Sequence, residues 1–510
     1  MSTSWTLTLP QLATALTVFE RVCIIVAIHV ALSLSCRLAG VETPNWPQFL
    51  GPGGDSTATG QSIPLSFGPE TNLLWKSEML PGNSSPCIWG DRLFISAYEN
   101  QELVMLALDR HNGKTLWERR LTATSEVDFI HRSANPAQPT PCTDGERVYF
   151  YFGSYGLLAL DKEGKTVWEK PLSPPKGNFG TGTSPILFDG ILYLNRDNTD
   201  ASSILAIDPE NGESLWEHPR IGYKNTQTTP YLWKNRLGTE LVIAGSHSLV
   251  SLDPKSGQLL WKVDDTCGMP CSSPTGNADR LVFGSWSPTH VDGSEKVIAH
   301  FDDDLVFTEE ELRDPAALHA RFDSDGDGLI TRRELPRSRA RDVFKWMDRN
   351  RNDGIDVDEL SILLRPAGRG RNIMVAVEAG GTGLLNETEF LAWEFSNRLP
   401  YVPTPLISEN RVYFVKSLGL LTCLDASTGT PFYVGERVGV KGEYFASPIK
   451  AGNAILVASS LGSVIAIRDS EQFEILAQND LGEEILATPA VVDDTLYLRT
   501  ANTMWAFRKQ

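Results

Sequence analysis

The sequence predicts an all-β fold, an eight-bladed β-propeller of four-stranded antiparallel blades with a small α-helical insertion in the fifth blade. Three observations lead to this fold. A Ser/Thr-Pro dipeptide recurs along the chain, a hairpin pattern ending in Trp follows the earlier copies, and one interval between dipeptides is far longer than the others. A repeat of roughly 40 to 50 residues is the sequence signature of a propeller or solenoid.

The Ser/Thr-Pro dipeptide predicts the first strand of each blade. Proline has no N–H, so a strand that begins there needs no ladder partner at that point, which suits the inner edge of a blade beside a channel. A turn and an apolar strand follow each copy and complete a hairpin. The prolines are Pro86, Pro141, Pro185, Pro230, Pro274, Pro405, Pro448 and Pro489.

The second hairpin of each blade is predicted from Asp, Gly and Trp at regular spacing. Asp opens the turn, Gly takes the positive-φ position, and Trp lies on the strand that follows. A blade cannot bury both faces alone, so we expect neighbouring blades to stack with the Trp packed between them. The well-matched copies end at Trp117, Trp168, Trp216 and Trp261, and the looser copies at Trp393, Tyr433, Leu476 and Trp505.

The first and last repeats are expected to share a blade. The last repeat stops before its outermost strand, and residues 73–76 (LLWK) have the pattern of that missing strand. Pairing of the two would close the ring and remove the open sheet edges of a linear array. The predicted organisation is a leader at 1–40, propeller at 45–298, insertion at 299–371 and propeller again at 372–510.

The spacing of Asp, Gly and Trp resembles the pyrroloquinoline-quinone (PQQ) repeat of quinoprotein propellers. Residues 45–49 (NWPQF) also resemble the N-terminal segment of exported bacterial relatives. The family includes PQQ-dependent dehydrogenases and non-enzymatic propellers such as the outer-membrane assembly lipoprotein BamB, so the resemblance implies the fold and leaves the activity open. The matching triplets are Asp109, Gly113 and Trp117; Asp208, Gly212 and Trp216; and Asp253, Gly257 and Trp261.

The long interval between Pro274 and Pro405 contains a calcium-binding motif. Residues 323–334 match the twelve-residue EF-hand loop, in which hard oxygen ligands surround the ion and Gly328 permits a sharp turn. The expected ligands are the carboxylates of Asp323, Asp325 and Asp327, the carbonyl of Leu329, Thr331 through water, and a bidentate Glu334. A structural clip is the expected role, because calcium is steadily available outside the cytosol.

A second loop at residues 348–359 departs from the motif in one position. Its glycine, Gly354, stands at position seven instead of six, so Asp353 must take a positive φ and weaker binding is expected. Ile330 and Ile355 at equivalent positions predict a short strand pairing between the loops. The alternative, that both stretches are solvated acidic surface, stays open. The expected ligands are Asp348, Asn350, Asn352, Gly354, Asp356 and Glu359.

The N-terminus and the charge bear on localisation and partners. The apolar stretch from Cys23 to Cys36 predicts a signal peptide and export to the periplasm or cell envelope, with a retained or lipidated anchor as the alternative. The net charge of -18 argues against nucleic acid. A monomer is expected, since a closed ring has no open sheet edge. Cys267 and Cys271 are compatible with a local bridge or with two buried thiols.

The sequence assigns no catalytic residue and leaves any cofactor-binding residue unknown. The resemblance implies that PQQ-dependent enzymes hold the quinone in the central funnel with calcium, and many carry adjacent cysteines, which this chain lacks. Polar segments at residues 131–135, 178–183, 225–228 and 443–444 are candidates for the channel mouth. The expected function is a non-catalytic calcium-binding scaffold for a protein or polymer partner. The alternative is a periplasmic PQQ-dependent quinoprotein dehydrogenase.

Overall fold

The computed structural model describes residues 45–58, 62–123, 134–175, 180–197, 201–223, 226–287, 305–312, 314–342, 344–348, 350–363 and 370–509. The predicted leader, residues 1–40, lies outside these residues, as do residues 131–133, 178–179 and 225 of the predicted mouth segments. Within the described ranges, no helix is both long enough and apolar enough to cross a membrane.

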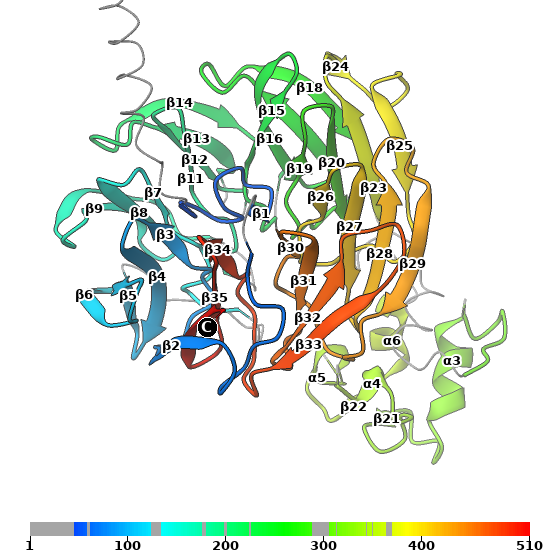
Figure 1. Cartoon of the computed structure of the whole chain (residues 1–510). Helices are drawn as coiled ribbons and strands as arrows, with labels where there is room; N and C mark the ends of the chain where they lie inside the picture. Colours follow the sequence, from blue (N-terminus) through cyan, green and yellow to red (C-terminus); the bar gives the residue numbers. More distant parts are fainter. Residues whose placement is uncertain are drawn as a thin grey trace, which may run out of the picture. The chain divides into compact units, whose positions relative to one another are not determined.

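Eight antiparallel sheets form the blades of a β-propeller and lie around a common centre (Figure 1). The first blade consists of β3 (Cys87–Trp89), β4 (Arg92–Glu99), β5 (Glu102–Asp109) and β6 (Thr115–Thr122). The second consists of β7 (Cys142–Thr143), β8 (Arg147–Phe152), β9 (Gly156–Asp161) and β10 (Thr166–Pro171). The third consists of β11 (Ile186–Phe188), β12 (Ile191–Asn195), β13 (Ser203–Ile207) and β14 (Ser214–Pro219). The fourth consists of β15 (Tyr231–Asn235), β16 (Gly238–Gly245), β17 (Ser248–Leu252) and β18 (Leu259–Asp264).

The remaining blades complete the ring and confirm the predicted fold class. The fifth consists of β19 (Thr275–Gly276), β20 (Arg280–Ser285), β23 (Ile373–Glu378) and β25 (Leu391–Phe395). The sixth consists of β26 (Leu406–Ser408), β27 (Arg411–Lys416), β28 (Leu420–Asp425) and β29 (Pro431–Arg437). The seventh consists of β30 (Ile449–Ala451), β31 (Ala454–Ala458), β32 (Ser463–Arg468) and β33 (Ile475–Asp480). The eighth consists of β34 (Ala490–Val492), β35 (Thr495–Arg499), β36 (Thr503–Arg508) and β2 (Leu73–Glu78).

Three strands join blades to which they are not adjacent in sequence. β2 pairs antiparallel with β36, so a strand from the N-terminal side completes the eighth blade. β1 (Thr57–Ala58) adds in parallel to the inner strand β30 of the seventh blade. β24 (Gly383–Leu384) adds in parallel to the outer strand β18 of the fourth blade. β24 therefore covers the outer edge of β18, and β2 joins the two ends of the ring.

The Ser/Thr of each dipeptide forms a closed ring of hydrogen bonds around the centre. In every case the backbone N–H of one Ser/Thr donates to the side-chain hydroxyl of the next, at distances between 2.9 and 3.1 Å. The order is Ser85, Thr140, Ser184, Thr229, Ser273, Thr404, Ser447 and Thr488, which donates to Ser85. This ring explains why a Ser or Thr precedes the proline in each dipeptide. The sequence pattern accounts for the proline alone.

Tryptophans on the outer strands join neighbouring blades, as expected. The Trp168 ring lies over Gly212 of the next blade, and its indole N–H donates to the carbonyl of Pro209 at 2.9 Å. The same arrangement holds for Trp75 over Gly113, Trp117 over Gly164, Trp216 over Gly257 and Trp393 over Gly429. Trp261 differs, because its N–H donates to Glu240 of its own blade at 2.6 Å.

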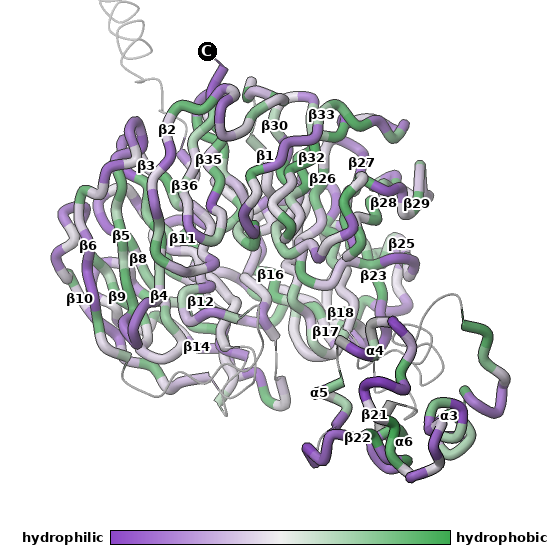
Figure 2. Tube along the Cα trace, turned by 90° about the horizontal axis from the view of Figure 1, so that it is seen from below, coloured by the Kyte–Doolittle hydropathy of each residue, from purple (hydrophilic) through white to green (hydrophobic). Residues whose placement is uncertain are grey.

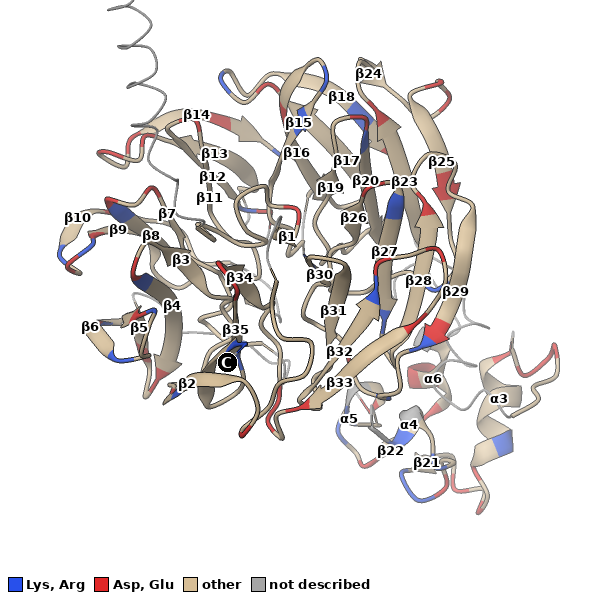
Figure 3. Cartoon of the chain, in the orientation of Figure 1, with Lys and Arg blue, Asp and Glu red and all other residues tan. Residues whose placement is uncertain are grey.

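Hydropathy follows the position of a strand within its blade. The second and third strands, such as β5 and β8, are apolar and buried, whereas outer strands such as β6 and β10 carry hydrophilic residues (Figure 2). Lys, Arg, Asp and Glu residues lie mainly on outer strands and turns (Figure 3). Among the inner strands, β15 and β30 each contain one lysine, Lys234 and Lys450, and the others contain no charged residue: β3, β7, β11, β19, β26 and β34. The inner face of the ring is thus largely uncharged.

The insertion lies between β20 and β23 of the fifth blade and has a hydrophobic core of its own. Its elements are α3 (Pro315–Phe322), β21 (Ile330–Thr331), α4 (Arg339–Asp342), α5 (Phe344–Met347), β22 (Gly354–Ile355) and α6 (Val357–Leu363). Helix α3 begins with proline after Asp314, whose carboxylate accepts a hydrogen bond from the Ala316 N–H. The side chains of Leu318, Ile330, Ile355 and Leu360 are fully buried together.

Candidate functional site

A cavity of about 170 Å³ lies on the axis of the ring, and all eight blades contribute to its wall. We call it the axial cup. The ring of Ser and Thr residues encircles it, and residues two positions before each of them form its rim. The rim residues are Asn83, Gln138, Gly182, Gln227, Cys271, Val402, Phe445 and Leu486, and the other described residues of the wall include Phe49, Ala134, Met269 and Tyr401.

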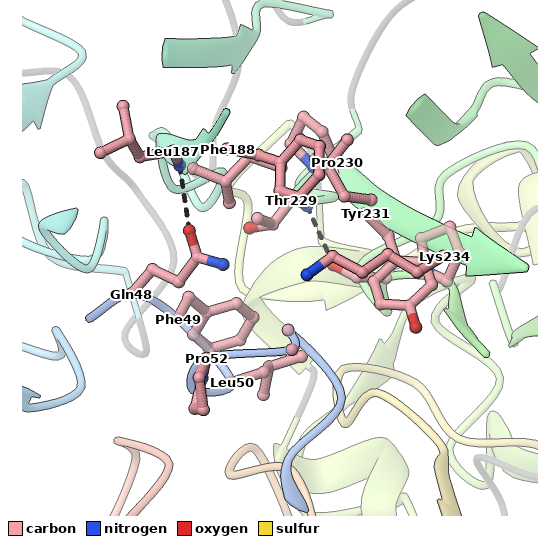
Figure 4. Close-up of a pocket in the computed structure, with 16 residues that line it drawn as sticks. Gln48, Phe49, Leu50, Pro52, Leu187, Phe188, Thr229, Pro230, Tyr231 and Lys234 are labelled. Atoms are coloured by element: carbon pink, nitrogen blue, oxygen red, sulfur yellow. Dashed lines mark hydrogen bonds between the residues drawn. The ribbon is translucent and has the colours of Figure 1, made fainter. Parts of the chain in front are cut away.

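The N-terminal segment crosses the axis at one end of the axial cup. The carbonyl of Pro47 accepts from the Thr143 N–H at 2.9 Å, and the Gln48 side chain accepts from the Leu187 N–H at 2.9 Å (Figure 4). Further along, the Lys450 N–H in the seventh blade donates to the Ser56 carbonyl at 2.9 Å. Phe49, between these anchors, lines both the axial cup and a cavity of about 30 Å³ beneath the segment.

The rim of the axial cup is divided into a polar half and an apolar half. Blades one to four place Asn83, Gln138, Gly182 and Gln227 there, whereas blades five to eight place Cys271, Val402, Phe445 and Leu486. Periodicity did not predict this division, because the rim position varies freely in sequence from blade to blade. Counting two residues back from each Ser/Thr-Pro dipeptide would have identified it.

No described residue that lines the axial cup carries a charge at neutral pH. Burial raises the pKa of the Cys271 thiol to about 12 and that of Cys267 to about 11. Both sulfurs are free thiols in the structure. The cup therefore offers hydroxyls, amides, thiols and apolar groups to a ligand.

Most described residues of the predicted mouth segments form hydrogen bonds within the propeller and do not line the axial cup. Asn135 accepts from the Ala137 N–H at 2.8 Å, and Tyr444 is buried with its hydroxyl donating to the Val440 carbonyl at 3.0 Å. Thr226 donates to Asp197, which is fully buried in a bidentate ion pair with Arg220 at 2.6 and 2.8 Å. Of these segments, Ala134, Gly182 and Gln227 reach the cup.

In the insertion, the three aspartates of the first loop converge. Carboxylate oxygens of Asp323, Asp325 and Asp327 all lie within 4.8 Å of one another. Glu334 faces the same loop, with one oxygen accepting from the Ser324 N–H at 2.9 Å and the other from the Thr331 N–H at 2.7 Å. The N–H of Thr331, followed by its hydroxyl, lowers the pKa of Glu334 to about 2. This oxygen-rich donor set suits a hard cation.

The second loop repeats this geometry with strained backbone in place of glycine. Asp348 accepts from two loop N–H groups, as Asp323 does, and Glu359 accepts from the Asn350 and Asp356 N–H groups at 3.0 and 3.2 Å. Asp353 has the positive φ that its position required, +65°, and Arg351 has one of +60°. The corresponding residues of the first loop are Gly326 and Gly328.

A short antiparallel pairing of Ile330 with Ile355 joins the loops. The structure places the remaining candidate ligands on the same two loops: Leu329 precedes β21 and Thr331 lies in it, whereas Gly354 lies in β22 and Asn352 and Asp356 flank that strand. The sequence did not single out His319. It is buried at the end of α3, with Nδ1 3.7 Å from Asp323 and Nε2 3.1 Å from the Ile355 carbonyl, so it contacts both loops.

Comparisons with known proteins agree with the fold. A family model described as outer membrane protein assembly factor BamB matches residues 69–180 and 179–266. The quinoprotein alcohol dehydrogenase PedH of Pseudomonas putida is 28% identical over 125 residues, which are 23% of this chain and 20% of that enzyme. The match thus spans about a fifth of the enzyme's length.

Two solved structures are similar over most of the chain. The quinohemoprotein alcohol dehydrogenase from Comamonas testosteroni has 13% identity and a TM-score of 0.52, with 92% of this chain and 81% of that chain covered. A computationally designed protein has 10% identity and a TM-score of 0.51, with 86% and 99% covered. At these identities the likeness shows the fold alone. The eight blades make the chain a β-propeller, and its residues 69–266 are similar to the repeats of the BamB family model.

Proposed function

We propose that this chain is an exported, non-catalytic β-propeller scaffold that binds calcium through the two inserted loops and presents its propeller loops to a protein or polymer partner. The observation that carries the proposal is the pair of hydrogen-bonded acidic loops with matched geometry, set in a propeller whose described axial wall is neutral. The match to a model of an envelope assembly factor supports export and a binding role.

Calcium suits the first loop because its ligands are hard oxygens in the EF-hand order. Asp323, Asp325 and Asp327 would supply carboxylates on one side, and Glu334, already held by two N–H donors, would supply both oxygens on the other. The bound cation would relieve the mutual repulsion of the aspartates. Binding would therefore stabilise the fold of the insertion, which is the role of a structural clip.

The second loop is proposed as a weaker calcium site. Arg351 and Asp353 hold left-handed backbone that costs roughly 1 to 2 kcal/mol per residue relative to glycine. This strain would offset part of the free energy of calcium binding and so lower the affinity of the second loop. The pairing of Ile330 with Ile355 links the two loops, so filling the first would order the second.

PQQ does not fit the described wall of the axial cup. PQQ is a tricarboxylic quinone, and burying its anionic groups requires cationic side chains or a metal held by carboxylates. The described residues around the cup provide neutral amides, hydroxyls and apolar groups instead. Phe49 also occupies one end of the axis.

Calorimetric titration of the chelator-treated protein with calcium tests the proposal. We expect one tight and one weaker site, with Glu334→Gln removing the tight one and Glu359→Gln the weaker one. Glu310→Gln is the matched control, because Glu310 is exposed on the same insertion and the change removes one negative charge outside both loops. Unchanged affinity in Glu334→Gln would refute calcium binding by the first loop.

A second candidate function is a periplasmic PQQ-dependent dehydrogenase, favoured by the sequence match to quinoprotein alcohol dehydrogenase PedH. It predicts that added PQQ and calcium give alcohol- or sugar-dependent reduction of an artificial dye. Dye reduction that depends on PQQ would favour this function over the scaffold.

A further inference from the structure

The axial cup has the chemistry of a site for an uncharged sugar. We infer that it binds one neutral sugar residue at the end of a glycan chain. This inference rests on the proposed function and deepens it, because it names the class of polymer that the scaffold would hold. Three properties of the cup carry it: its amides, its apolar half and its neutral, small volume.

The amide half offers both donors and acceptors in fixed orientation. The Gln227 Oε1 accepts from the Gly182 N–H at 2.5 Å, and its Nε2 donates to the Gly180 carbonyl at 3.4 Å. Since a glutamine amide has two hydrogens and two lone pairs, these bonds leave one of each for a ligand. Gln138 is oriented in the same way by its donation to the Thr181 carbonyl at 3.3 Å. Adjacent sugar hydroxyls both donate and accept, so they match such amides.

The apolar half lies across the ring from the amides. Phe445 and Leu486 come from the seventh and eighth blades, and Tyr401 precedes the sixth. The Tyr401 ring is held edge-on against Trp286 at 5.6 Å between ring centroids. A pyranose has polar edges and an apolar C–H face, which packs against aromatic and aliphatic side chains. One ring could therefore contact both halves of the cup at once.

The size and neutrality of the axial cup set the class of ligand. Its volume of about 170 Å³ is below the ~300 to 1,000 Å³ of pockets for drug-sized ligands, so it holds about one ring. Phe49 lines the cup from the crossing N-terminal segment, so a chain would enter by its end. A sulfate or uronate group would lose its hydration without gaining a cationic partner among the described wall residues. Neutral sugars are therefore favoured over acidic ones.

The test is calorimetric titration of the full-length, calcium-loaded protein with cellotetraose, maltotetraose and chitotetraose, beside an acidic oligogalacturonate and a neutral tetrapeptide amide. We expect saturable binding of at least one neutral oligosaccharide and none of the acidic one. Gln227→Ala and Phe445→Ala should each weaken it about tenfold, through lost hydrogen bonds and lost apolar contact respectively. Gln258→Ala is the matched control, since Gln258 lies in an exposed turn of the fourth blade.

Four outcomes would overturn the inference: no binding of any neutral oligosaccharide, preference for the acidic one, preference for the peptide, or unchanged affinity in Gln227→Ala with an unaltered melting temperature. A calcium titration of the same samples separates this inference from the function beneath it. If calcium binds as expected and no sugar does, only the sugar site is refuted. If Glu334→Gln leaves calcium affinity unchanged, the calcium-binding scaffold itself is refuted, whatever the sugars do.

Discussion

Gly212→Ala is expected to lower the melting temperature more than an alanine substitution at a comparable open turn. Gly212 has a φ of +77°, and a Cβ at this position would lie 2.7 Å from Cε3 of Trp168 in the neighbouring blade. Two costs would therefore add: left-handed backbone for alanine, roughly 1 to 2 kcal/mol, and overpacking against the indole, roughly 1 to 3 kcal/mol. Gly190 in the same blade has a φ of +73° with no atom within 4 Å of the added Cβ, so Gly190→Ala measures the backbone cost alone.

These free energies convert into modest temperature shifts. A folded unit of this size has an unfolding entropy of about 1 kcal/mol per degree, from roughly 2.1 cal/mol/K per residue. Gly212→Ala should therefore melt about 2 to 5 °C lower and Gly190→Ala about 1 to 2 °C lower. Trp168→Ala should itself cost about 3 to 5 °C, because a largely buried Trp is lost. In that background the clash is absent, and Gly212→Ala should cost only about 1 to 2 °C more.

Scanning calorimetry at fixed calcium concentration is the assay, since bound calcium alone would shift the transition. Equal shifts for Gly212→Ala and Gly190→Ala would refute the packing of Trp168 on the turn glycine. A Gly212→Ala shift of the same size with and without Trp168 would refute it as well.

Three further predictions concern the hydroxyl ring and the insertion. Thr229→Val removes the hydroxyl that accepts from the Ser184 N–H at 3.0 Å. The melting temperature measured by calorimetry should fall by about 1 to 3 °C, and by less in Thr229→Ser, which keeps a hydroxyl. An unchanged melting temperature in Thr229→Val would contradict the role of the ring. Asp353→Gly relieves a φ of +65° that costs roughly 1 to 2 kcal/mol. By titration the second loop should therefore bind calcium about five- to thirtyfold more tightly. Unchanged affinity would contradict the strain argument. The pKa of Glu334 is lowered to about 2 from an ordinary 4.5, so this carboxylate stabilises the insertion above about pH 4.5, and the contribution is lost as the pH falls toward 2. NMR spectra that follow acid unfolding of the insertion should show that Glu334→Gln loses this pH dependence. An acid transition identical to that of the unchanged protein would contradict the prediction.

The repeated features of the fold could be predicted from the sequence because the same residue patterns recur from blade to blade. The Ser/Thr-Pro dipeptides mark the first strand of every blade, and the Asp, Gly and Trp pattern marks the contact between blades. Even so, β7 and β19 are only two residues long, and Trp261 bonds within its own blade. The acceptor of the Trp261 indole N–H is the Glu240 carboxylate, where the other outer-strand tryptophans use a backbone carbonyl of the next blade. A repeat pattern cannot predict such a change in one blade.

Contacts between non-repeated segments could not be predicted, because no sequence pattern indicates which residues far apart in the chain are in contact. Phe49 reaches the axis through a segment tied to the second, third and seventh blades. β24 completes an edge of the fourth blade although its residues belong to a hairpin of the fifth. The axial cup depends on contacts between distant segments, whereas each acidic loop of the insertion lies within twelve consecutive residues. The loops were therefore visible in the sequence, and the cup was not.

The central claim, a neutral axial cup in a calcium-binding scaffold, is tested most directly by titrating the chelator-treated protein with PQQ in excess calcium while assaying dye reduction on alcohols and sugars. The structure predicts calcium uptake by the insertion, no saturable binding of PQQ and no dye reduction. Saturable PQQ binding with an additional calcium site and substrate-dependent dye reduction would contradict it and identify the protein as a dehydrogenase.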